Sequence, residues 1–333
     1  MKSRLLGSKG FEVSEVGLGC WQLGADWGDR VDEDTAFAIL QAAVDNGVTL
    51  FDTADVYGAG LSESLIGRFF EQSAAAKPRI ITKFGRGGDV YPDGYTRDRL
   101  RAGLEGSLER LKVDRLDLVQ LHCIPTEVLR HGEIFDWLRE MQAEGLIAHF
   151  GASVETVEEG LIAMEQEGLL SLQVIFNIFR QKLVTELFPR AQETGTGIIV
   201  RLPLASGLLS GKFTQDTRFN DTDHRNFNAD GQLFNVGETF AGVPFAKGVE
   251  LVDALKADLP TTNLPAGTSM GDVAMRWILD HPAVSTVIPG ASSPAQVARN
   301  AAASDLAPLS DDLHAQMKTF YRDQVAAHIR GAY

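Results

Sequence analysis

Short apolar runs alternate along this chain with longer segments in which apolar residues recur at helical spacing. A short apolar run bounded by turn residues is typical of a buried strand, and the second pattern is typical of a helix with one buried face. The predicted strands cover residues 16–19, 48–52, 79–83, 116–122, 148–153, 172–176, 197–202 and 285–288. The predicted helices cover residues 34–46, 62–72, 97–111, 133–144, 157–167, 185–193, 245–257, 269–280, 294–302 and 311–326.

The predicted strands and helices follow one another in eight consecutive units, which predicts an α/β fold. In a chain of 333 residues this alternation favours one closed (β/α)8 barrel, a TIM barrel, over an open doubly wound sheet. The chain also lacks an early Gly-x-Gly-x-x-Gly turn, which is typical of the first nucleotide-binding unit of a doubly wound sheet.

Three further segments complete the predicted architecture. Residues 1–16 hold two short apolar pieces around the sequence GSKG, which predicts a β-hairpin that caps the barrel. Extra helices are expected at the carboxyl end. Residues 213–243 are rich in Asp, Asn and Gly and exceed the ordinary length of a connection, so they are expected to form a lid or cofactor belt, with a disordered surface loop as the alternative. No linker-like stretch interrupts the chain, so residues 1–333 are expected to form a single domain.

The formal net charge of −14 disfavours nucleic acids and anionic membranes as partners, because both require a broad positive surface. The amino terminus lacks the continuous apolar run of a signal peptide, and no later segment has the pattern of a membrane span. The two cysteines, Cys20 and Cys123, fit a reduced cytoplasmic protein. No group of Cys and His has the spacing of metal ligands, so no metal is expected.

Chemically competent side chains occur at the ends of three consecutive predicted strands. Asp52 ends one strand and Tyr57 follows it in a glycine-containing turn, while Lys83 and His122 end the next two strands. The carboxyl ends of all barrel strands open on one face, so these four residues are expected to converge. Any one of them alone would more often be a packing residue or a solvated charge, but the set together indicates a catalytic site.

This set suits the polarisation of a carbonyl group. A tyrosine can donate a proton to a carbonyl oxygen, although its ordinary pKa of about 10 lies well above neutral pH. The Lys83 ammonium is expected to lower the pKa of Tyr57, and Asp52 is expected to hold that ammonium charged and in place. His122 can orient the carbonyl and share the proton. Asp55 is expected to serve only the turn. No metal is required, so a bound cofactor would supply the hydride.

The segments that carry these residues resemble motifs of the aldo-keto reductases. The resemblance rests on GLGCW at residues 17–21, FDTADVYG at residues 51–58, IITK at residues 80–83 and LDLVQLH at residues 116–122. It extends from Arg4 to about Ala303. It implies that Tyr57 is the general acid and base, that Lys83 and Asp52 tune it, and that His122 positions the substrate carbonyl.

Two later loops suit phosphate binding. Residues 201–212, RLPLASGLLSGK, follow a predicted strand and combine two glycines, two serines and a lysine, so backbone N–H groups and a cation can reach a pyrophosphate. Residues 289–294, PGASSP, follow the last strand and open a helix, a position at which barrels often bind phosphate. Both loops resemble the cofactor loops of bacterial aldo-keto reductases that are similar to potassium-channel β subunits.

That resemblance implies a bound nicotinamide dinucleotide. The adenosine phosphate and adenine would contact Gly290, Ser292, Gln296 and Asn300, the nicotinamide carboxamide Ser153 and Gln173, and the pyrophosphate Leu204, Ser206 and Lys212. The whole implied set of cofactor contacts is Gly19, Cys20, Trp21, Ser153, Gln173, Arg201, Leu202, Pro203, Leu204, Ser206, Gly207, Lys212, Gly290, Ser292, Gln296, Arg299 and Asn300.

Four positions depart from that family's pattern. Arg201 stands where many members have an aromatic ring that stacks on the nicotinamide, and a planar guanidinium can also stack. Val154 replaces a polar residue after Ser153. Arg299 stands where the residue is often acidic, and it could meet a 2′-phosphate or remain a solvated helix residue. Gly290 lies where other branches have a phosphate-binding lysine. The expected cofactor is NADP(H), with NAD(H) as the alternative.

The substrate pocket is expected among the loops at the same face. Its candidate wall residues are Trp21, Trp27, Phe84, Tyr91 and Tyr95, and such a wall accommodates aldehydes, ketones and sugar-derived carbonyls. The leading expectation is a reversible NADPH-dependent carbonyl reductase with a small-molecule substrate. A cofactor-sensing regulatory subunit with little turnover is the alternative, and the complete Asp-Tyr-Lys-His set favours the enzyme. A phosphate-binding barrel hydrolase or isomerase is disfavoured by the absence of metal ligands.

Overall fold

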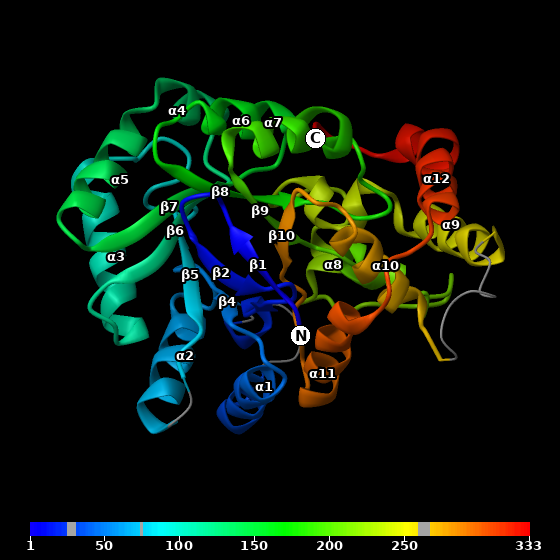
Figure 1. The fold of residues 1–333 in the computed structure, drawn as a ribbon, viewed down its shortest axis with the longest axis horizontal. Coiled ribbons are helices and arrows are strands. Elements are labelled where there is room, and N and C mark those ends of the chain that lie inside the picture. Colours follow the sequence, from blue (N-terminus) through cyan, green and yellow to red (C-terminus); the bar gives the residue numbers. More distant parts are fainter. Residues whose placement is uncertain (25–30, 74–75, 259–266) are drawn as a thin grey trace.

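An eight-stranded parallel sheet organises the chain, whose computed structural model describes residues 1–24, 31–73, 76–258 and 267–333 (Figure 1). Every strand of this sheet pairs with the next one along the chain, from β3 (Leu18–Gly19) to β10 (Val284–Val287). Parallel bridges from Val16 to Val287 and from Gly19 to Gly290 join the two ends of the sheet. The predicted (β/α)8 barrel is therefore confirmed.

The barrel strands are almost entirely buried, because the interior covers one face of each strand and the helices cover the other. Between β3 and β10 the strands are β4 (Leu50–Asp52), β5 (Arg79–Phe84), β6 (Leu116–His122), β7 (Ile147–Ser153), β8 (Leu169–Ile175) and β9 (Gly197–Arg201). The predicted strands agree with these bounds within a few residues.

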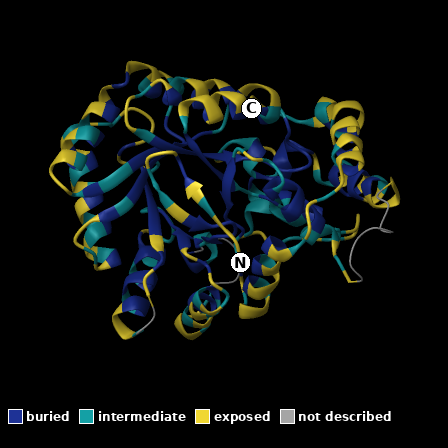
Figure 2. Cartoon of the chain, viewed as in Figure 1, coloured by how far each residue is buried: buried dark blue, intermediate teal, exposed yellow. Residues whose placement is uncertain are grey.

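Helices surround the strands and turn their apolar faces inward, so exposed residues lie mainly on their outer sides (Figure 2). Helix α5 is an example, because its buried residues Ile134, Phe135, Leu138 and Met141 recur at helical spacing. The helices are α1 (Glu33–Asp45), α2 (Leu61–Gln72), α3 (Arg97–Leu111), α4 (Thr126–His131), α5 (Glu133–Ala143), α6 (Val157–Met164), α7 (Leu183–Thr194), α8 (His224–Phe227), α9 (Phe245–Asp258), α10 (Met270–Leu279), α11 (Pro294–Ala302) and α12 (Asp311–Phe320).

Outside residues 213–243, the structure differs from the predicted helices mainly at three places. Helix α4 was not predicted, because its one buried residue, Leu129, gives no periodic signal. The helix predicted over residues 157–167 ends at Met164. The last predicted helix, over residues 311–326, ends at Phe320 and continues as a π turn, η7 (Tyr321–Val325), and a 3-10 turn, η8 (Ala326–His328).

Residues 213–243 follow an irregular path that contains three short helical turns. They hold α8, η3 (Val236–Glu238) and η4 (Phe240–Gly242). The side chain of Asp223 accepts a hydrogen bond from the Arg225 N–H at the start of α8, and that of Asn235 accepts one from the Gly237 N–H at the start of η3. Such single-turn elements depend on caps and carry no apolar period, so the sequence pattern predicts only a long connection.

The amino-terminal hairpin closes the end of the barrel at which the strands begin. Its strands β1 (Ser3–Leu6) and β2 (Phe11–Ser14) pair antiparallel. Leu6 and Val13 are fully buried and share one apolar cluster with residues of the barrel strands, including Leu50 and Ile199. The predicted hairpin is present, and it fills the barrel interior at this end.

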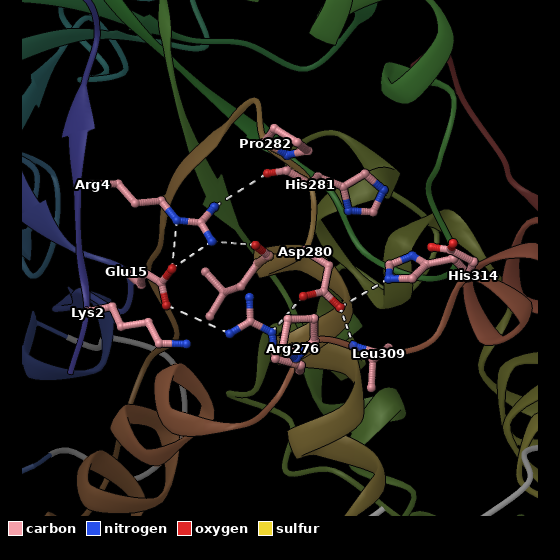
Figure 3. Close-up of a pocket in the computed structure, with 12 residues that line it drawn as sticks. Lys2, Arg4, Glu15, Arg276, Asp280, His281, Pro282, Leu309 and His314 are labelled. Carbon is pink, nitrogen blue, oxygen red and sulfur yellow. Dashed lines mark hydrogen bonds and ion pairs between the residues drawn. The ribbon is translucent and has the colours of Figure 1, made fainter. Parts of the chain in front are cut away.

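An ion-pair network fastens the hairpin to the last helices around a pocket of about 640 Å³ (Figure 3). Arg4 Nε donates to Glu15 Oε1 over 2.7 Å. Asp280 accepts from Arg276 Nε over 2.9 Å and lies 3.1 Å from His314 Nε2. Arg276 Nη1 lies 3.8 Å from Glu15 Oε2, and Arg4 Nη2 donates to the Leu279 carbonyl over 2.5 Å. These contacts join β1, α10 and α12 at the end of the barrel opposite the carboxyl ends of the strands.

Candidate active site

Four polar side chains meet at the carboxyl ends of β4, β5 and β6. Lys83 Nζ lies 2.7 Å from Asp52 Oδ2 and 3.1 Å from the Tyr57 hydroxyl. The His122 ring stands edge-on to the Tyr57 ring, with ring centroids 5.9 Å apart. The structure thus brings together the four residues that were expected to converge.

Strand geometry and one tight turn position these side chains. Asp52 and Lys83 point into the barrel interior, and both are buried. Tyr57 belongs to the turn after β4, in which its N–H donates to the Ala54 carbonyl over 3.2 Å. The next residue, Gly58, has φ of 60° and lies so close to the Gly24 backbone that a side chain would overlap it. Glycine is therefore required beside Tyr57.

The Lys83 ammonium uses all three of its N–H donors within the site. They are directed to Asp52 Oδ2 at 2.7 Å, to the Thr53 carbonyl at 2.8 Å and to the Tyr57 hydroxyl at 3.1 Å. Burial alone would lower the pKa of Lys83, but the Asp52 carboxylate and the Tyr57 phenol outweigh it and raise that pKa. Lys83 is therefore a charged ammonium across the physiological pH range.

The pKa of Tyr57 departs upward from its ordinary value, contrary to the expected net lowering. Burial raises this pKa, and Asp52 raises it too, while Lys83 and Arg201 lower it. The expected influence of Lys83 is therefore present but smaller than the cost of burying a phenolate. Because the hydroxyl accepts a hydrogen bond from an ammonium, which has no acceptor of its own, the phenol proton is directed elsewhere. Tyr57 is thus held as a neutral acid.

His122 is held as a neutral imidazole. Burial lowers its pKa well below the ordinary value, and the cations Lys83, Arg86 and Arg201 lower it further. Its Nδ1 atom is buried and has no hydrogen-bond partner within the described part of the chain. A neutral imidazole with an open nitrogen can accept or donate one hydrogen bond to a bound molecule.

Two of the expected nicotinamide contacts lie beside this group. Gln173 Nε2 donates to Asp52 Oδ1 over 2.7 Å and to Gln120 Oε1 over 2.8 Å, so this amide holds the carboxylate that faces Lys83. Ser153 ends β7, and its Oγ lies 3.6 Å from Cys123 Sγ. In this structure Gln173 therefore positions the Asp52 carboxylate.

The loop after β9 has an unusual backbone. Ala205, Ser206 and Gly207 have consecutive positive φ angles of 47°, 55° and 97°. The Ala205 and Gly207 N–H groups donate to the Leu202 and Leu204 carbonyls over 3.1 Å and 2.9 Å, so these two backbone donors are used within the loop. The Ser206 hydroxyl donates to the Glu238 carbonyl and accepts from the Phe240 N–H, both over 3.1 Å. This expected pyrophosphate residue therefore also anchors residues 213–243.

The other residues of this loop differ in exposure. Pro203 is buried, Leu202 and Leu204 are half-buried, and Lys212 is exposed. The loop therefore presents a cation at its far end.

The loop after β10 leads into α11 as expected. The Ser293 side chain caps α11 by accepting from the Gln296 N–H. Gln296 Oε1 in turn accepts from the Ser292 N–H over 3.1 Å, and Asn300 Nδ2 donates to the Gly290 carbonyl over 3.3 Å. Arg299 is exposed and has no ion pair with a described residue. The expected adenosine-phosphate residues thus lie around one helix amino terminus.

Gly290 lies close to the beginning of the barrel. A side chain at this position would overlap the amide of Gln22, whose buried Oε1 has no partner among the described residues. Gly19 bridges to Gly290, and the neighbouring Cys20 is fully buried. The first and last strands therefore bring two separate expected cofactor segments together.

A cluster of charged side chains, which the sequence did not indicate, lies beside His122. It consists of Arg86, Glu155, Arg201 and Glu238, called here the mouth cluster. Arg86 Nη1 lies 2.9 Å from Glu238 Oε1, and Arg201 Nη1 lies 3.6 Å from the same oxygen. Arg86 Nη2 lies 3.6 Å from Glu155 Oε1. Only spatial proximity identifies this set, because its members come from four separate segments.

Cys123 adjoins the mouth cluster. Its sulfur and the carboxylates of Glu155 and Glu238 are atom types that ligate metal ions. Its Sγ and carboxylate oxygens of Glu155 and Glu238 lie within 4.8 Å of one another. However, Arg201 Nη2 contacts the sulfur over 3.5 Å, and both carboxylates already pair with guanidinium groups. Burial raises the pKa of the Cys123 thiol to about 11, so it is a neutral thiol. The arrangement is that of an ion-pair cluster.

The expected pocket wall is only partly reproduced. Phe84 is 4% exposed and packs against Gly103 of α3, because its strand neighbour Lys83 occupies the interior face. Tyr91 is 45% exposed, and the Tyr95 hydroxyl donates to the Gly85 carbonyl over 2.7 Å. Strand alternation thus removes Phe84 from the wall, and Trp27 lies outside the described residues.

Trp21 lies at the carboxyl end of β3 and meets the long connection. Its ring is 4.8 Å from that of His224, measured between centroids. His224 belongs to α8 in residues 213–243, so this segment reaches the mouth of the barrel at Trp21 as well as at Glu238.

The carboxyl group of Asp55 is buried, unlike that of an ordinary turn residue. Its Oδ1 is buried without a partner among the described residues, and burial together with Glu63 raises its pKa to about 7. Its N–H donates to the Lys83 carbonyl over 3.4 Å. A second carboxyl group that titrates near neutral pH therefore lies next to the Tyr57 turn.

The class of protein follows from these observations together with sequence comparison. The chain matches the aldo/keto reductase family over residues 15–322 and belongs to that family. It is therefore an oxidoreductase of a family that acts on carbonyl and alcohol groups with NAD(P)H. Within the described residues no helix is long and apolar enough to cross a membrane.

Particular members of the family are similar over nearly the whole chain. The aldo-keto reductase YhdN of Bacillus subtilis (strain 168) is 28% identical over 301 residues, which cover 89% of this chain and 87% of YhdN. A probable voltage-gated potassium channel subunit beta of Oryza sativa subsp. japonica is 30% identical over 331 residues, 93% of each chain.

Solved structures are similar throughout. The glycerol dehydrogenase AKR11B4 from Gluconobacter oxydans superposes with a TM-score of 0.77 at 26% identity, covering 99% of this chain and 98% of its own. The holo form of aldo-keto reductase AKR11C1 from Bacillus halodurans gives a TM-score of 0.75 at 25% identity, covering 100% of this chain and 98% of its own. The predicted family and fold are confirmed.

Proposed function

We propose that this protein is an NADPH-dependent reductase of small aldehydes and ketones, including sugar-derived carbonyls, and that the reaction is reversible. The observation that carries the proposal is the hydrogen bond from Lys83 Nζ to the Tyr57 hydroxyl. It leaves the phenol proton available to a substrate oxygen. The relative named glycerol dehydrogenase supports a polar carbonyl or alcohol substrate.

The residues present suit a nicotinamide dinucleotide. Three buried polar atoms at the carboxyl ends of the strands, Gln22 Oε1, His122 Nδ1 and Arg201 Nε, lack partners among the described residues. The amino terminus of α11 supplies a place for a phosphate, and the exposed Lys212 supplies a cation at the end of the loop after β9. When bound, the nicotinamide supplies or accepts the hydride at the substrate carbon.

The side chains of this site donate and accept the proton of the reaction. Tyr57 donates its hydroxyl proton to the carbonyl oxygen, and the resulting phenolate lies against the Lys83 ammonium, which stabilises it. Asp52, itself held by Gln173, keeps that ammonium in position. His122, as a neutral imidazole, orients the carbonyl oxygen by a hydrogen bond. In alcohol oxidation the phenolate accepts the hydroxyl proton.

The two directions of the reaction are expected to depend differently on pH. Reduction requires protonated Tyr57 and neutral His122. Asp55 and Glu155, each with a pKa of about 7, titrate near the site, so the test uses the interval above them. Because the pKa of Tyr57 is raised above its ordinary value and that of His122 is lowered, kcat for reduction should be flat between about pH 8 and 10. Oxidation requires the phenolate, so its kcat should rise across the same interval. Steady-state rates at saturating cofactor test this, and a fall in reduction rate within this interval would contradict the neutral phenol assigned to Tyr57.

Arg299→Ala tests the cofactor preference. If the exposed guanidinium meets the 2′-phosphate, its removal should weaken NADPH binding by about tenfold, an ordinary value for one charge-assisted contact, and leave NADH binding unchanged. Fluorescence titration with both cofactors measures this. Equal losses for the two would reject the contact, and Arg190→Ala, on the outer side of the barrel in α7, is the matched control.

The alternative is a cofactor-sensing regulatory subunit, which the resemblance to probable potassium-channel β subunits supports. Titration with NADPH, followed by the absorbance decay of NADPH with a panel of small aldehydes, separates the two. Binding with aldehyde-dependent decay supports the reductase. Tight binding without turnover of any aldehyde supports the sensor, and a lack of binding would contradict both.

A further inference from the structure

The mouth cluster lies beside the atoms that would hold a substrate carbonyl. Arg86 follows Lys83 on the loop after β5, and Arg201 ends β9. Arg201 Nη2 lies 3.5 Å from the sulfur of Cys123, the residue that follows His122. Both guanidinium groups also lower the pKa of His122. A substrate held by Tyr57 and His122 would have the mouth cluster as its neighbour.

Three guanidinium groups and two carboxylates set the charge of this region. The guanidinium groups are those of Arg86, Arg180 and Arg201, and Arg180 donates only to backbone carbonyls in the described structure. Burial and the neighbouring Glu238 raise the pKa of Glu155 to about 7, so this group is only partly ionised at neutral pH. The cations therefore outnumber the ionised carboxylates, and Glu238 carries most of the negative charge.

Glu238 is the ionised carboxylate that lies between two of these cations. Burial alone would raise its pKa, but Arg86 and Arg201 outweigh burial and lower the pKa to about 2. Its Oε1 lies between the two guanidinium groups, 2.9 Å from Arg86 Nη1 and 3.6 Å from Arg201 Nη1. A carboxylate between two arginines is the arrangement by which proteins bind a carboxylate ligand.

The segment that carries Glu238 is fixed on both sides of this residue. Ser206 Oγ bonds to the Glu238 carbonyl and to the Phe240 N–H, both over 3.1 Å. Asn235 Nδ2 donates to Glu155 Oε2 over 3.0 Å. These hydrogen bonds anchor the part of residues 213–243 that holds the Glu238 carboxylate between the two arginines.

We propose that Glu238 occupies, from within the chain, an anion-binding position between Arg86 and Arg201, and thereby makes the enzyme discriminate against carbonyl compounds that carry a carboxylate. A substrate carboxylate would meet the ionised Glu238 in a site of low dielectric, where like charges repel strongly. Uncharged carbonyl compounds avoid this repulsion. The inference rests on the proposed reductase function and adds the residue that sets substrate charge.

The test compares two aldehydes of equal chain length, butanal and 4-oxobutanoate, which differ by the carboxylate. The native enzyme should reduce butanal with the higher kcat/KM. Glu238→Gln keeps the size of the side chain and removes its charge, so the ratio of kcat/KM for 4-oxobutanoate over butanal should rise by about tenfold or more, as expected for one charge-assisted contact. Glu238→Asp should keep the native ratio, and Glu250→Gln, an exposed glutamate of α9 paired with Lys247, is the charge-matched control.

A second readout does not require turnover. Succinate should raise the melting temperature of the Glu238→Gln holoenzyme and have little effect on the native holoenzyme. Adding Arg86→Met to Glu238→Gln should remove both the succinate effect and the gain in the kcat/KM ratio, because it removes one of the two guanidinium groups that would bind the anion. Glu238→Ala replaces the glutamine variant if that variant does not fold.

The outcomes separate the two proposals. An unchanged substrate ratio and no succinate effect in Glu238→Gln, while butanal is still reduced, would overturn the role of Glu238. A native ratio that already favours 4-oxobutanoate would overturn it as well. A native enzyme that reduces neither aldehyde, together with succinate stabilisation of Glu238→Gln, would uphold the anion position and count against the reductase function.

Discussion

Tyr57→Phe is expected to lower kcat for carbonyl reduction by about 10²- to 10⁴-fold, the range found for the loss of a general acid. The substitution removes only the hydroxyl that lies 3.1 Å from Lys83 Nζ, and the ring retains its edge-on contact with His122. The affinity for NADPH should stay within a few-fold of the native value. Single-turnover reduction of butanal, with fluorescence titration of NADPH on the same sample, measures both quantities.

The matched control for this experiment is Tyr321→Phe. It removes a hydroxyl that lies 2.6 Å from the Tyr333 hydroxyl, in the carboxyl-terminal turns, and it leaves Asp52, Lys83 and Tyr57 unchanged. Turnover should remain native in this variant. Native turnover in Tyr57→Phe would instead remove Tyr57 as the acid and direct attention to His122 or to the neighbouring Asp55.

Lys83→Met is expected to damage both stability and turnover. Lys83 and Asp52 form a buried ion pair, with side chains 0% and 5% exposed. Removal of one partner leaves an uncompensated buried charge, so the free energy of unfolding should fall by about 3–5 kcal/mol. The phenolate that forms when Tyr57 donates its proton also loses its cation, so kcat should fall as far as in Tyr57→Phe. Urea denaturation and single-turnover rates measure the two effects.

The double variant Lys83→Met with Asp52→Asn distinguishes the two roles of the lysine. An amide at position 52 carries no charge, so most of the lost stability should return, while turnover should not. Recovery of turnover together with stability would show that Lys83 acts only as a structural partner of Asp52. Loss of turnover that persists in a stable double variant would support its action on Tyr57.

The sequence permitted the prediction of the barrel because each strand and helix carries its own signal. Apolar runs such as residues 116–122 must be buried on both faces, and periodic segments such as residues 97–111 must bury one face, so both patterns are local. Turn chemistry in α4 and in residues 213–243 gave no period, and these elements were therefore missed or left as a long connection.

Some residues of the candidate site could likewise be predicted from the sequence, and others could not. Asp52, Lys83 and His122 could be predicted because each ends a strand, and the ends of parallel barrel strands must meet. Phe84 was assigned to the pocket wall, but strand alternation turns it toward α3 once Lys83 faces the interior. The mouth cluster could not be predicted, because Glu238 lies in a connection whose path depends on tertiary contacts.

By itself the sequence determined the family, the order of strands and helices, and the residue types that meet at the strand ends, because these depend on local pattern and on the rule that parallel strands share a direction. Only the tertiary structure decided the net protonation of those residues. Burial is a property of the packed molecule, and it raises the pKa of Tyr57 although Lys83 lowers it. The position of Glu238 between Arg86 and Arg201 was decided in the same way, by contacts between segments that the sequence keeps far apart.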